Sequence, residues 1–157
     1  MPEQPLRVLF ICTGNSARSQ MAEAILRHLS RGQVDVASAG SHPRTEIHPM
    51  AREAVAKIFR LEMAGQHPKS FDGFLGQRFD YVISVCDRAA ESCPVFPGGP
   101  TRIRWSFEDP AEAAGSDEQK RRAFERTATD LMQRIRVWLS LPALSSRTGL
   151  ARAGHPI

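Results

Sequence analysis

The sequence predicts a single doubly wound α/β domain, in which helices cover both faces of a four-stranded, mainly parallel sheet. Short apolar runs rich in β-branched residues are typical of parallel strands that are covered on both sides. Between these runs, apolar residues recur every three or four positions, which is the pattern of amphipathic helices. The length of 157 residues suits one domain, because a chain of this size can bury a core without disulfide bonds.

Four segments have the residue pattern of strands. Residues 6–12 (LRVLFIC) and 81–85 (YVISV) are the two short apolar runs, and we expect them to form buried parallel strands. Residues 33–39 (QVDVASA) place two valines on one face. Residues 101–107 (TRIRWSF) alternate apolar and polar side chains, so we expect this segment to form an edge strand.

Three segments have the pattern of helices. The first begins near Arg18 and keeps an apolar face as far as Leu29. Residues 48–59 follow, with a proline near the helix start and small or branched apolar residues on one face. The third starts after Ser116 with acidic residues in its first turn, and we expect it to stop before Pro142.

The catalytic α/β domain is expected to span residues 1–141. Residues 142–157 lack hydrophobic periodicity, so we expect a poorly ordered C-terminal tail. The chain shows no secretory signal, and no apolar run approaches the roughly 20 residues of a membrane span. Its three cysteines cannot all pair with one another, which favours reactive thiols in a reducing cytoplasm over a disulfide scaffold.

The basic residues argue against one class of function. The formal charge is +4, and 18 of the 21 basic residues are arginine, which could mark a nucleic-acid or phosphoprotein binding surface. However, the arginines are scattered, no run of like charge exceeds residues 120–122, and aromatic residues are not interleaved with them. We therefore interpret most of them as solvated helix faces, and we expect a monomer without a nucleic-acid or membrane partner.

The connection between the first strand and the first helix carries the clearest chemical signal. Five small or polar residues separate Cys12 from Arg18, and these are Thr13, Gly14, Asn15, Ser16 and Ala17. A loop of small residues at a helix N-terminus can turn its backbone N–H groups toward an anion. At the carboxyl end of a parallel strand, this is also where α/β proteins bind ligands.

Three side chains of this connection would act on the bound anion. Arg18 can grip two oxygens of a tetrahedral oxyanion, and the positive field of the loop favours the thiolate of Cys12, a nucleophile. Ser19 can donate a hydrogen bond to that sulfur and stabilise it as a leaving group. The alternative is a buried cysteine at a strand end, followed by an ordinary loop.

Asp109 is a candidate general acid. It precedes a proline in the loop after the last predicted strand, where its carboxyl group could protonate the oxygen that leaves the anion. The alternative is an Asx turn, in which local backbone satisfies the carboxylate. Because the cysteine loop supplies a reaction that needs an acid, we favour the first interpretation.

These residues resemble a known superfamily. The stretch CTGNSARS at 12–19 and the D-P pair at 109–110 are similar to the low-molecular-weight protein tyrosine phosphatases, and about residues 6–140 fit that pattern. Three stretches, CTGNSARSQMAEA, SVCDRAAESCPVFPGG and WSFEDPA, resemble the thioredoxin-coupled arsenate reductases within it. The resemblance implies the superfamily's doubly wound fold and an enzyme that reduces arsenate to arsenite without a cofactor.

The resemblance also implies roles for all three cysteines. Cys12 would attack arsenate, Cys86 would attack the thio-arsenate adduct on Cys12, and Cys93 would then take over the disulfide from Cys12. Thioredoxin, or a similar thiol reductant, would reduce the Cys86–Cys93 pair. From the residues alone, Cys86 can approach Cys12 only if their strands are neighbours, and the alternative is two structural thiols.

A phosphatase remains the second hypothesis. It would hydrolyse phosphotyrosine or small phosphate esters through a phosphocysteine and would need neither Cys86 nor Cys93. Phosphatases of this superfamily usually carry an aromatic residue after the D-P pair, whereas Ala111 stands here. This difference favours a small inorganic oxyanion, such as arsenate or phosphate, as the ligand.

One further comparison concerns a cation. Some of the reductases bind potassium beside the anion loop through asparagine, glutamate, serine and aspartate, and Asn15, Glu23 and Ser38 match the first three. Lys69 stands where the aspartate would be. Its ammonium group could replace the cation, or it could be a solvated surface lysine. We expect no metal, and the loop histidines lack the spacing of a zinc site.

Overall fold

The sheet is parallel throughout and has the order β2-β1-β3-β4 in the computed structural model, which describes residues 4–86, 93 and 95–149. Its strands are β1 (Leu6–Cys12), β2 (Val34–Gly40), β3 (Tyr81–Ser84) and β4 (Thr101–Arg104). The prediction of an α/β domain with a four-stranded parallel sheet is therefore confirmed, and β4 lies at the edge as expected. No helix in the described part of the chain is both long and apolar enough to cross a membrane.

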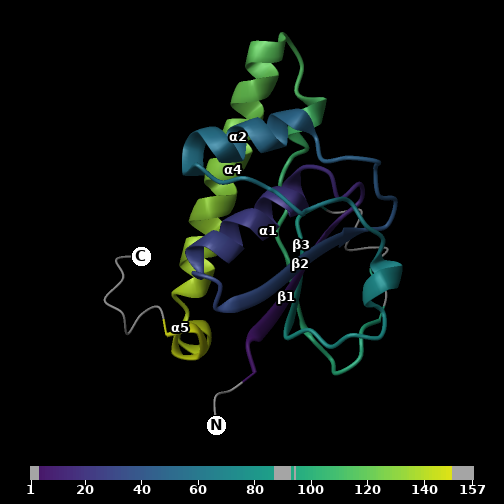
Figure 1. The fold of residues 1–157 in the computed structure, drawn as a ribbon, viewed down its shortest axis with the longest axis vertical. Coiled ribbons are helices and arrows are strands. Elements are labelled where there is room, and N and C mark those ends of the chain that lie inside the picture. The colour runs from purple at the N-terminus through teal and green to yellow at the C-terminus, as the bar shows by residue number, and fades with distance from the viewer. Residues whose placement is uncertain (1–3, 87–92, 94, 150–157) are drawn as a thin grey trace.

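The helices are α1 (Arg18–Leu29), α2 (Pro49–Phe59), α4 (Asp117–Leu139) and α5 (Pro142–Thr148), with short 3₁₀ turns η1 (Phe71–Phe74) and η2 (Pro110–Glu112). Helix α1 packs on β1 and β2, and α4 runs beside α1 and α2, so the three helices form one layer (Figure 1). Ser116 and Gln119 start α4 with a capping box, in which each side chain bonds the other residue's backbone N–H.

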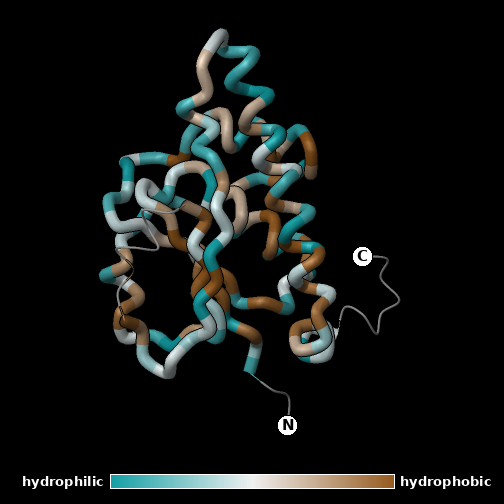
Figure 2. The backbone as a smooth tube through the Cα atoms, turned by 180° about the vertical axis from the view of Figure 1, so that it is seen from behind, coloured by the Kyte–Doolittle hydropathy of each residue, from teal (hydrophilic) through white to brown (hydrophobic). Residues whose placement is uncertain are grey.

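Aromatic side chains join this helical layer to the sheet. Trp138 of α4 meets Tyr81 of β3 and Trp105 edge-on, at ring-centroid distances of 5.2 and 6.0 Å. Phe10 of β1 lies 6.2 Å from Trp105 and is fully buried. Hydrophobic residues are accordingly concentrated along the central strands (Figure 2). Tyr81, the only tyrosine, is thus partly buried and packs against the core.

On the opposite face, the described residues that cover the sheet include η1 and the segment after it. Phe79 contacts Phe74 and Phe96, and the guanidinium carbon of Arg7 lies 4.6 Å from the centre of the Phe79 ring. Arg7 belongs to β1 and faces away from its neighbour Val8, because side chains alternate along a strand. The sheet therefore has two distinct covered faces.

The C-terminal segment differs from the expectation of a poorly ordered tail. Pro142 does not only follow α4; it also begins α5, in which Leu144 is buried. Proline is favourable at a first helical position, because its missing N–H would have no helical partner there. Arg147 donates a hydrogen bond to the carbonyl of Gln4 at 2.9 Å, which ties α5 to the start of β1. Residues 150–157 lie outside the described residues.

Gly40 at the end of β2 supports the loop after β1. A Cβ atom there would lie 2.5 Å from the carbonyl oxygen of Thr13 and 2.8 Å from that of Cys12. We therefore expect Gly40→Ala to lower the free energy of unfolding by about 2 kcal/mol, as measured by urea denaturation. Gly73→Ala is the control, because a Cβ there meets nothing within 4 Å. Equal unfolding midpoints for the two variants would contradict the prediction.

Candidate active site

The connection between β1 and α1 forms a cradle of backbone amides. Three of its carbonyl oxygens accept backbone N–H groups from the segment after β2, at 2.9, 2.9 and 3.0 Å: Thr13 from His42, Gly14 from Arg44 and Ser16 from His48. In a planar trans peptide the N–H points away from the C=O. Because these carbonyls point outward, the amides that follow them point inward, as an anion site requires.

Asn15 fixes the bend of this cradle. Its φ of 48° lies in the left-handed region, which asparagine tolerates better than most residues. Its side-chain oxygen accepts hydrogen bonds from Gln20 Nε2 at 3.0 Å and from the backbone N–H of Lys69 at 2.9 Å. Its side-chain nitrogen donates to Ser19 Oγ at 2.8 Å. The buried amide thus joins the loop, α1 and the segment before η1.

Ser19 donates a hydrogen bond to the sulfur of Cys12. The two side-chain atoms lie 2.9 Å apart. Since Ser19 Oγ already accepts a hydrogen from Asn15, its own hydrogen is free to point at the sulfur. This bond lowers the pKa of Cys12, because it stabilises the negative charge of a thiolate.

Cys86 has the opposite effect on the pKa of Cys12. It follows β3, which pairs directly with β1, and its sulfur lies 3.6 Å from Thr13 Oγ1. The neighbouring thiol of Cys86, together with burial, raises the pKa of Cys12 well above its usual range. The expectation that the loop keeps Cys12 as a thiolate is therefore wrong for this arrangement. The reason is that a second buried thiol competes for the same charge.

Replacing Cys86 by alanine is expected to lower the pKa of Cys12, because the largest cause of the raised value is removed. The pH profile of the rate at which iodoacetamide alkylates Cys12 should then shift to lower pH. At pH 7 the rate should be about tenfold higher in the variant than in the unaltered protein. The measurement is the pH profile of the alkylation rate, followed by mass spectrometry of the Cys12 peptide. Cys93→Ser is the control and should leave the profile in place. An unshifted profile for Cys86→Ala would exclude control by Cys86.

Arg18 and Asp109 meet at the side of the cradle. Arg18 Nη1 donates to the carbonyl of Phe107 at 2.8 Å, and Nη2 lies 3.7 Å from Asp109 Oδ2. Asp109 Oδ1 accepts the backbone N–H of Ala111 at 2.9 Å, which makes an Asx turn at the start of η2. The Asx turn is therefore present, the other carboxyl oxygen faces Arg18, and the role of Asp109 as a general acid stays a prediction.

These groups enclose a cavity of about 460 Å³. The residues predicted from the sequence that line it are Cys12, Thr13, Gly14, Ser16, Ala17, Arg18, Cys86 and Asp109. Asn15 and Ser19 lie beneath the cavity in the hydrogen-bond network described above. Cys93 is apart from this group, because it lines a smaller cavity of about 190 Å³.

Sequence reasoning missed five lining residues, which are His42, Arg44, His48, Phe107 and Glu112. Arg44 covers Gly14, where a Cβ atom would lie 3.3 Å from its Nε. His48 caps α2 by accepting the N–H of Met50 at 3.1 Å. Burial lowers the pKa of His48, and the charge of Asp109 opposes this shift. The H-P pair at the start of α2 was the available signal, and it indicated only a helix start.

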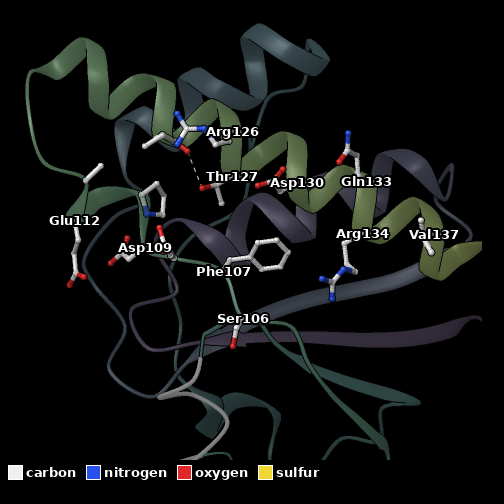
Figure 3. A pocket seen from close by; sticks show the side chains of 14 residues that line it. Ser106, Phe107, Asp109, Glu112, Arg126, Thr127, Asp130, Gln133, Arg134 and Val137 are labelled. Carbon is white, nitrogen blue, oxygen red and sulfur yellow. Dashed lines mark hydrogen bonds between the residues drawn. The ribbon is translucent and has the colours of Figure 1, made fainter.

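A larger open cavity of about 880 Å³ lies on the other side of the Asp109 loop. Figure 3 shows Phe107 between this loop and Arg134 of α4. The guanidinium carbon of Arg134 lies 5.7 and 5.9 Å from the ring centres of Trp105 and Phe107. Cation–π contacts of this kind attach the loop that carries Asp109 to α4.

Lys69 lies near Glu23, as the comparison with the potassium-binding reductases predicted. Its Nζ donates to the carbonyl of His67 at 3.0 Å. Burial lowers the pKa of Lys69, while the nearby charge of Glu23 opposes the shift. Glu23 itself pairs with Arg27 at 2.6 Å and accepts a hydrogen bond from Ser38 at 2.7 Å. The structure thus places two basic side chains near Glu23, and the replacement of a cation by Lys69 stays a prediction.

Comparison with known proteins identifies the family. A family model described as low molecular weight phosphotyrosine protein phosphatase matches residues 7–147. The arsenate reductase of Halalkalibacterium halodurans is 37% identical over 131 residues, which cover 83% of this chain and 93% of that protein. That of Bacillus subtilis is 33% identical over 129 residues, with 82% and 91% covered.

Solved structures agree with this assignment. A structure described as an arsenate reductase in the phosphate binding state has a TM-score of 0.67 and 26% identity, covering 86% of this chain and 97% of the other. A low molecular weight protein tyrosine phosphatase from T. tengcongensis has a TM-score of 0.66 and 25% identity, with 83% and 95% covered. The resemblance noted in the sequence is confirmed: the chain belongs to the low molecular weight phosphotyrosine protein phosphatase family.

Proposed function

We propose that this protein is an arsenate reductase that uses Cys12, Cys86 and Cys93 in series. The observation that carries the proposal is that Cys12 and Cys86, at the ends of paired strands, line the same cavity. A phosphatase releases its phosphocysteine with water and has no use for a second thiol there. Relatives that cover most of this chain are named arsenate reductases, which supports the same conclusion.

The first step would join arsenate to the protein. The inward amides of the cradle and Arg18 hold the oxyanion, with its arsenic facing the sulfur of Cys12. The thiol proton of Cys12 passes to an oxygen of the bound arsenate, and the sulfur forms a bond to arsenic while one arsenic–oxygen bond breaks. Asp109 gives its proton to the departing oxygen, which leaves as water. Ser19 stabilises the sulfur whenever it carries negative charge.

The second step would reduce arsenic. The thiolate of Cys86 attacks the sulfur of Cys12, and the electron pair of the sulfur–arsenic bond passes to arsenic. Arsenic(V) becomes arsenic(III), which leaves as arsenite, and a Cys12–Cys86 disulfide remains. Two thiols thus lose the two electrons that arsenic gains.

The third step would restore Cys12. Cys93 attacks Cys86, so that a Cys86–Cys93 disulfide forms and Cys12 leaves as a thiolate. Thioredoxin or a similar thiol reductant then reduces this disulfide. The proposal places the protein in the reducing cytoplasm, where the three cysteines that are free in the structure would stay reduced between turnovers. We propose a monomer as the working form.

The second candidate, a phosphatase acting on phosphotyrosine or small phosphate esters, is supported by the size of the cavity. A volume of about 460 Å³ leaves room beside a bound oxyanion, and Phe107 lines part of it. However, Ala111 also lines it, in the place where an aromatic residue usually follows the D-P pair in the phosphatases. We therefore rank this activity second.

The test is a thioredoxin-coupled assay with arsenate, run beside hydrolysis of an aryl phosphate. We expect arsenate turnover to exceed aryl phosphate turnover. Cys12→Ser is the control and should remove both activities, because both begin at this sulfur. If only the aryl phosphate is turned over, the protein is a phosphatase and the reductase proposal is wrong.

A further inference from the structure

Arg102 contacts the third cysteine directly. It lies on the edge strand β4, next to Val82 of β3 in the parallel register. Its Nη1 lies 2.9 Å from the sulfur of Cys93. A guanidinium can only donate hydrogen bonds, so the sulfur is the acceptor. An anionic sulfur accepts such a bond far more strongly than a neutral thiol does.

The contact lies at the surface, at the edge of a small cavity. Cys93 and Arg102 line this cavity of about 190 Å³ together with Ile11, Val82 and Ser84. Ile11 and Val82 are buried apolar residues, whereas the hydrogen bond between Arg102 and Cys93 is exposed. Arg104 lines the same cavity from the same strand, two residues further on, and therefore provides a matched control.

We propose that Arg102 is a positioning residue that holds the sulfur of Cys93, through this hydrogen bond, during its attack on Cys86. The inference rests on the proposed function, because only a thiol relay gives Cys93 a reaction. Cys93 gives its proton to solvent, and its sulfur bonds to the sulfur of Cys86. The Cys12–Cys86 bond breaks, and Cys12 leaves with the electron pair, so no external oxidant is needed.

The hydrogen bond has two opposing effects on the rate. It stabilises the attacking sulfur, which carries negative charge in thiol–disulfide exchange, and it makes that sulfur somewhat less nucleophilic. On a logarithmic scale, the loss of nucleophilicity offsets only about half of the stabilisation. The net effect of Arg102 is therefore a faster attack.

The first test measures the contact without any turnover. The fully reduced protein is alkylated with iodoacetamide at pH 7, and modification of the Cys93 peptide is followed by mass spectrometry. We expect Arg102→Gln to slow alkylation of Cys93 about fivefold to tenfold, Arg102→Lys to slow it less, and Arg104→Gln to change it by less than about twofold. Equal rates for Arg102→Gln and the unaltered protein would overturn the proposal. So would an equal loss in Arg104→Gln, because general surface charge would then explain the effect.

The second test asks whether Arg102 affects only the third step of the proposed relay and not the first two. One equivalent of arsenate is added without a reductant, and arsenite and the disulfides are measured against time. Arg102→Gln should release arsenite at the unaltered rate, whereas the Cys86–Cys93 disulfide should form about fivefold to tenfold more slowly. Disulfide exchange at the unaltered rate would overturn the inference. If the unaltered protein releases no arsenite, the proposed function fails, and the alkylation rates still decide whether Arg102 acts on the reactivity of the Cys93 sulfur.

Discussion

Replacing Cys86 by serine is expected to abolish thioredoxin-coupled arsenate reduction, with a loss of about a thousandfold or more in turnover. The reason is that a hydroxyl cannot form the disulfide that releases arsenite from Cys12. The variant should still form the thio-arsenate adduct, because the cradle, Arg18 and Asp109 are unchanged. Arsenite release, measured with and without thioredoxin, checks the expectation.

The same variant should retain slow hydrolysis of an aryl phosphate, since that reaction ends with water rather than with a thiol. This second activity is the internal control for a folded site. Serine is close to cysteine in size, so the packing beside Thr13 should be preserved. Continued arsenate turnover in Cys86→Ser would show that another thiol performs the second step.

Replacing Arg18 by lysine is expected to lower kcat/KM by about a hundredfold to a thousandfold for arsenate and aryl phosphate alike. The guanidinium offers a planar fork to two oxygens of the anion, whereas an ammonium group is a point charge. Arg18 also bonds the carbonyl of Phe107 and lies beside Asp109, so the change should loosen the loop that carries the acid. Steady-state kinetics with both substrates measure the loss.

Arg136→Lys provides the matched control, because Arg136 is an exposed residue of α4 and lies outside the cavity residues. It should keep both activities within about twofold. An Arg18→Lys variant that loses only arsenate turnover would contradict a shared oxyanion site. It would also mean that the two reactions use different parts of the cavity.

The sequence predicts the sheet well because each strand carries its own signal. The run at 6–12 is apolar on both faces, and it becomes the central strand β1, which is paired on both sides. The segment α5 was missed because seven residues with one buried leucine have no visible periodicity. Its order depends on a contact from Arg147 to the other end of the chain, which no local pattern contains.

The candidate site also has features that the sequence predicts and features that depend on tertiary contacts. The cradle and Arg18 follow each other in the chain, so their arrangement could be predicted from one motif. The pKa of Cys12 could not, because it depends on Cys86, which is distant in sequence and arrives through the pairing of β1 with β3. His42 and Arg44 enter the cavity wall because their backbone N–H groups bind the loop carbonyls. Those bonds are tertiary and leave no mark in the side-chain pattern.

The closeness of Cys86 to Cys12 affects how the protein withstands oxidation by peroxide. A thiol that keeps its proton reacts slowly with oxidants, so the resting enzyme is a poor target. Should Cys12 nevertheless become a sulfenic acid, the adjacent thiol can condense with it before irreversible oxidation follows. Accidental damage would then end in the same disulfide that the proposed relay makes, and the cell's thiol reductants would repair it.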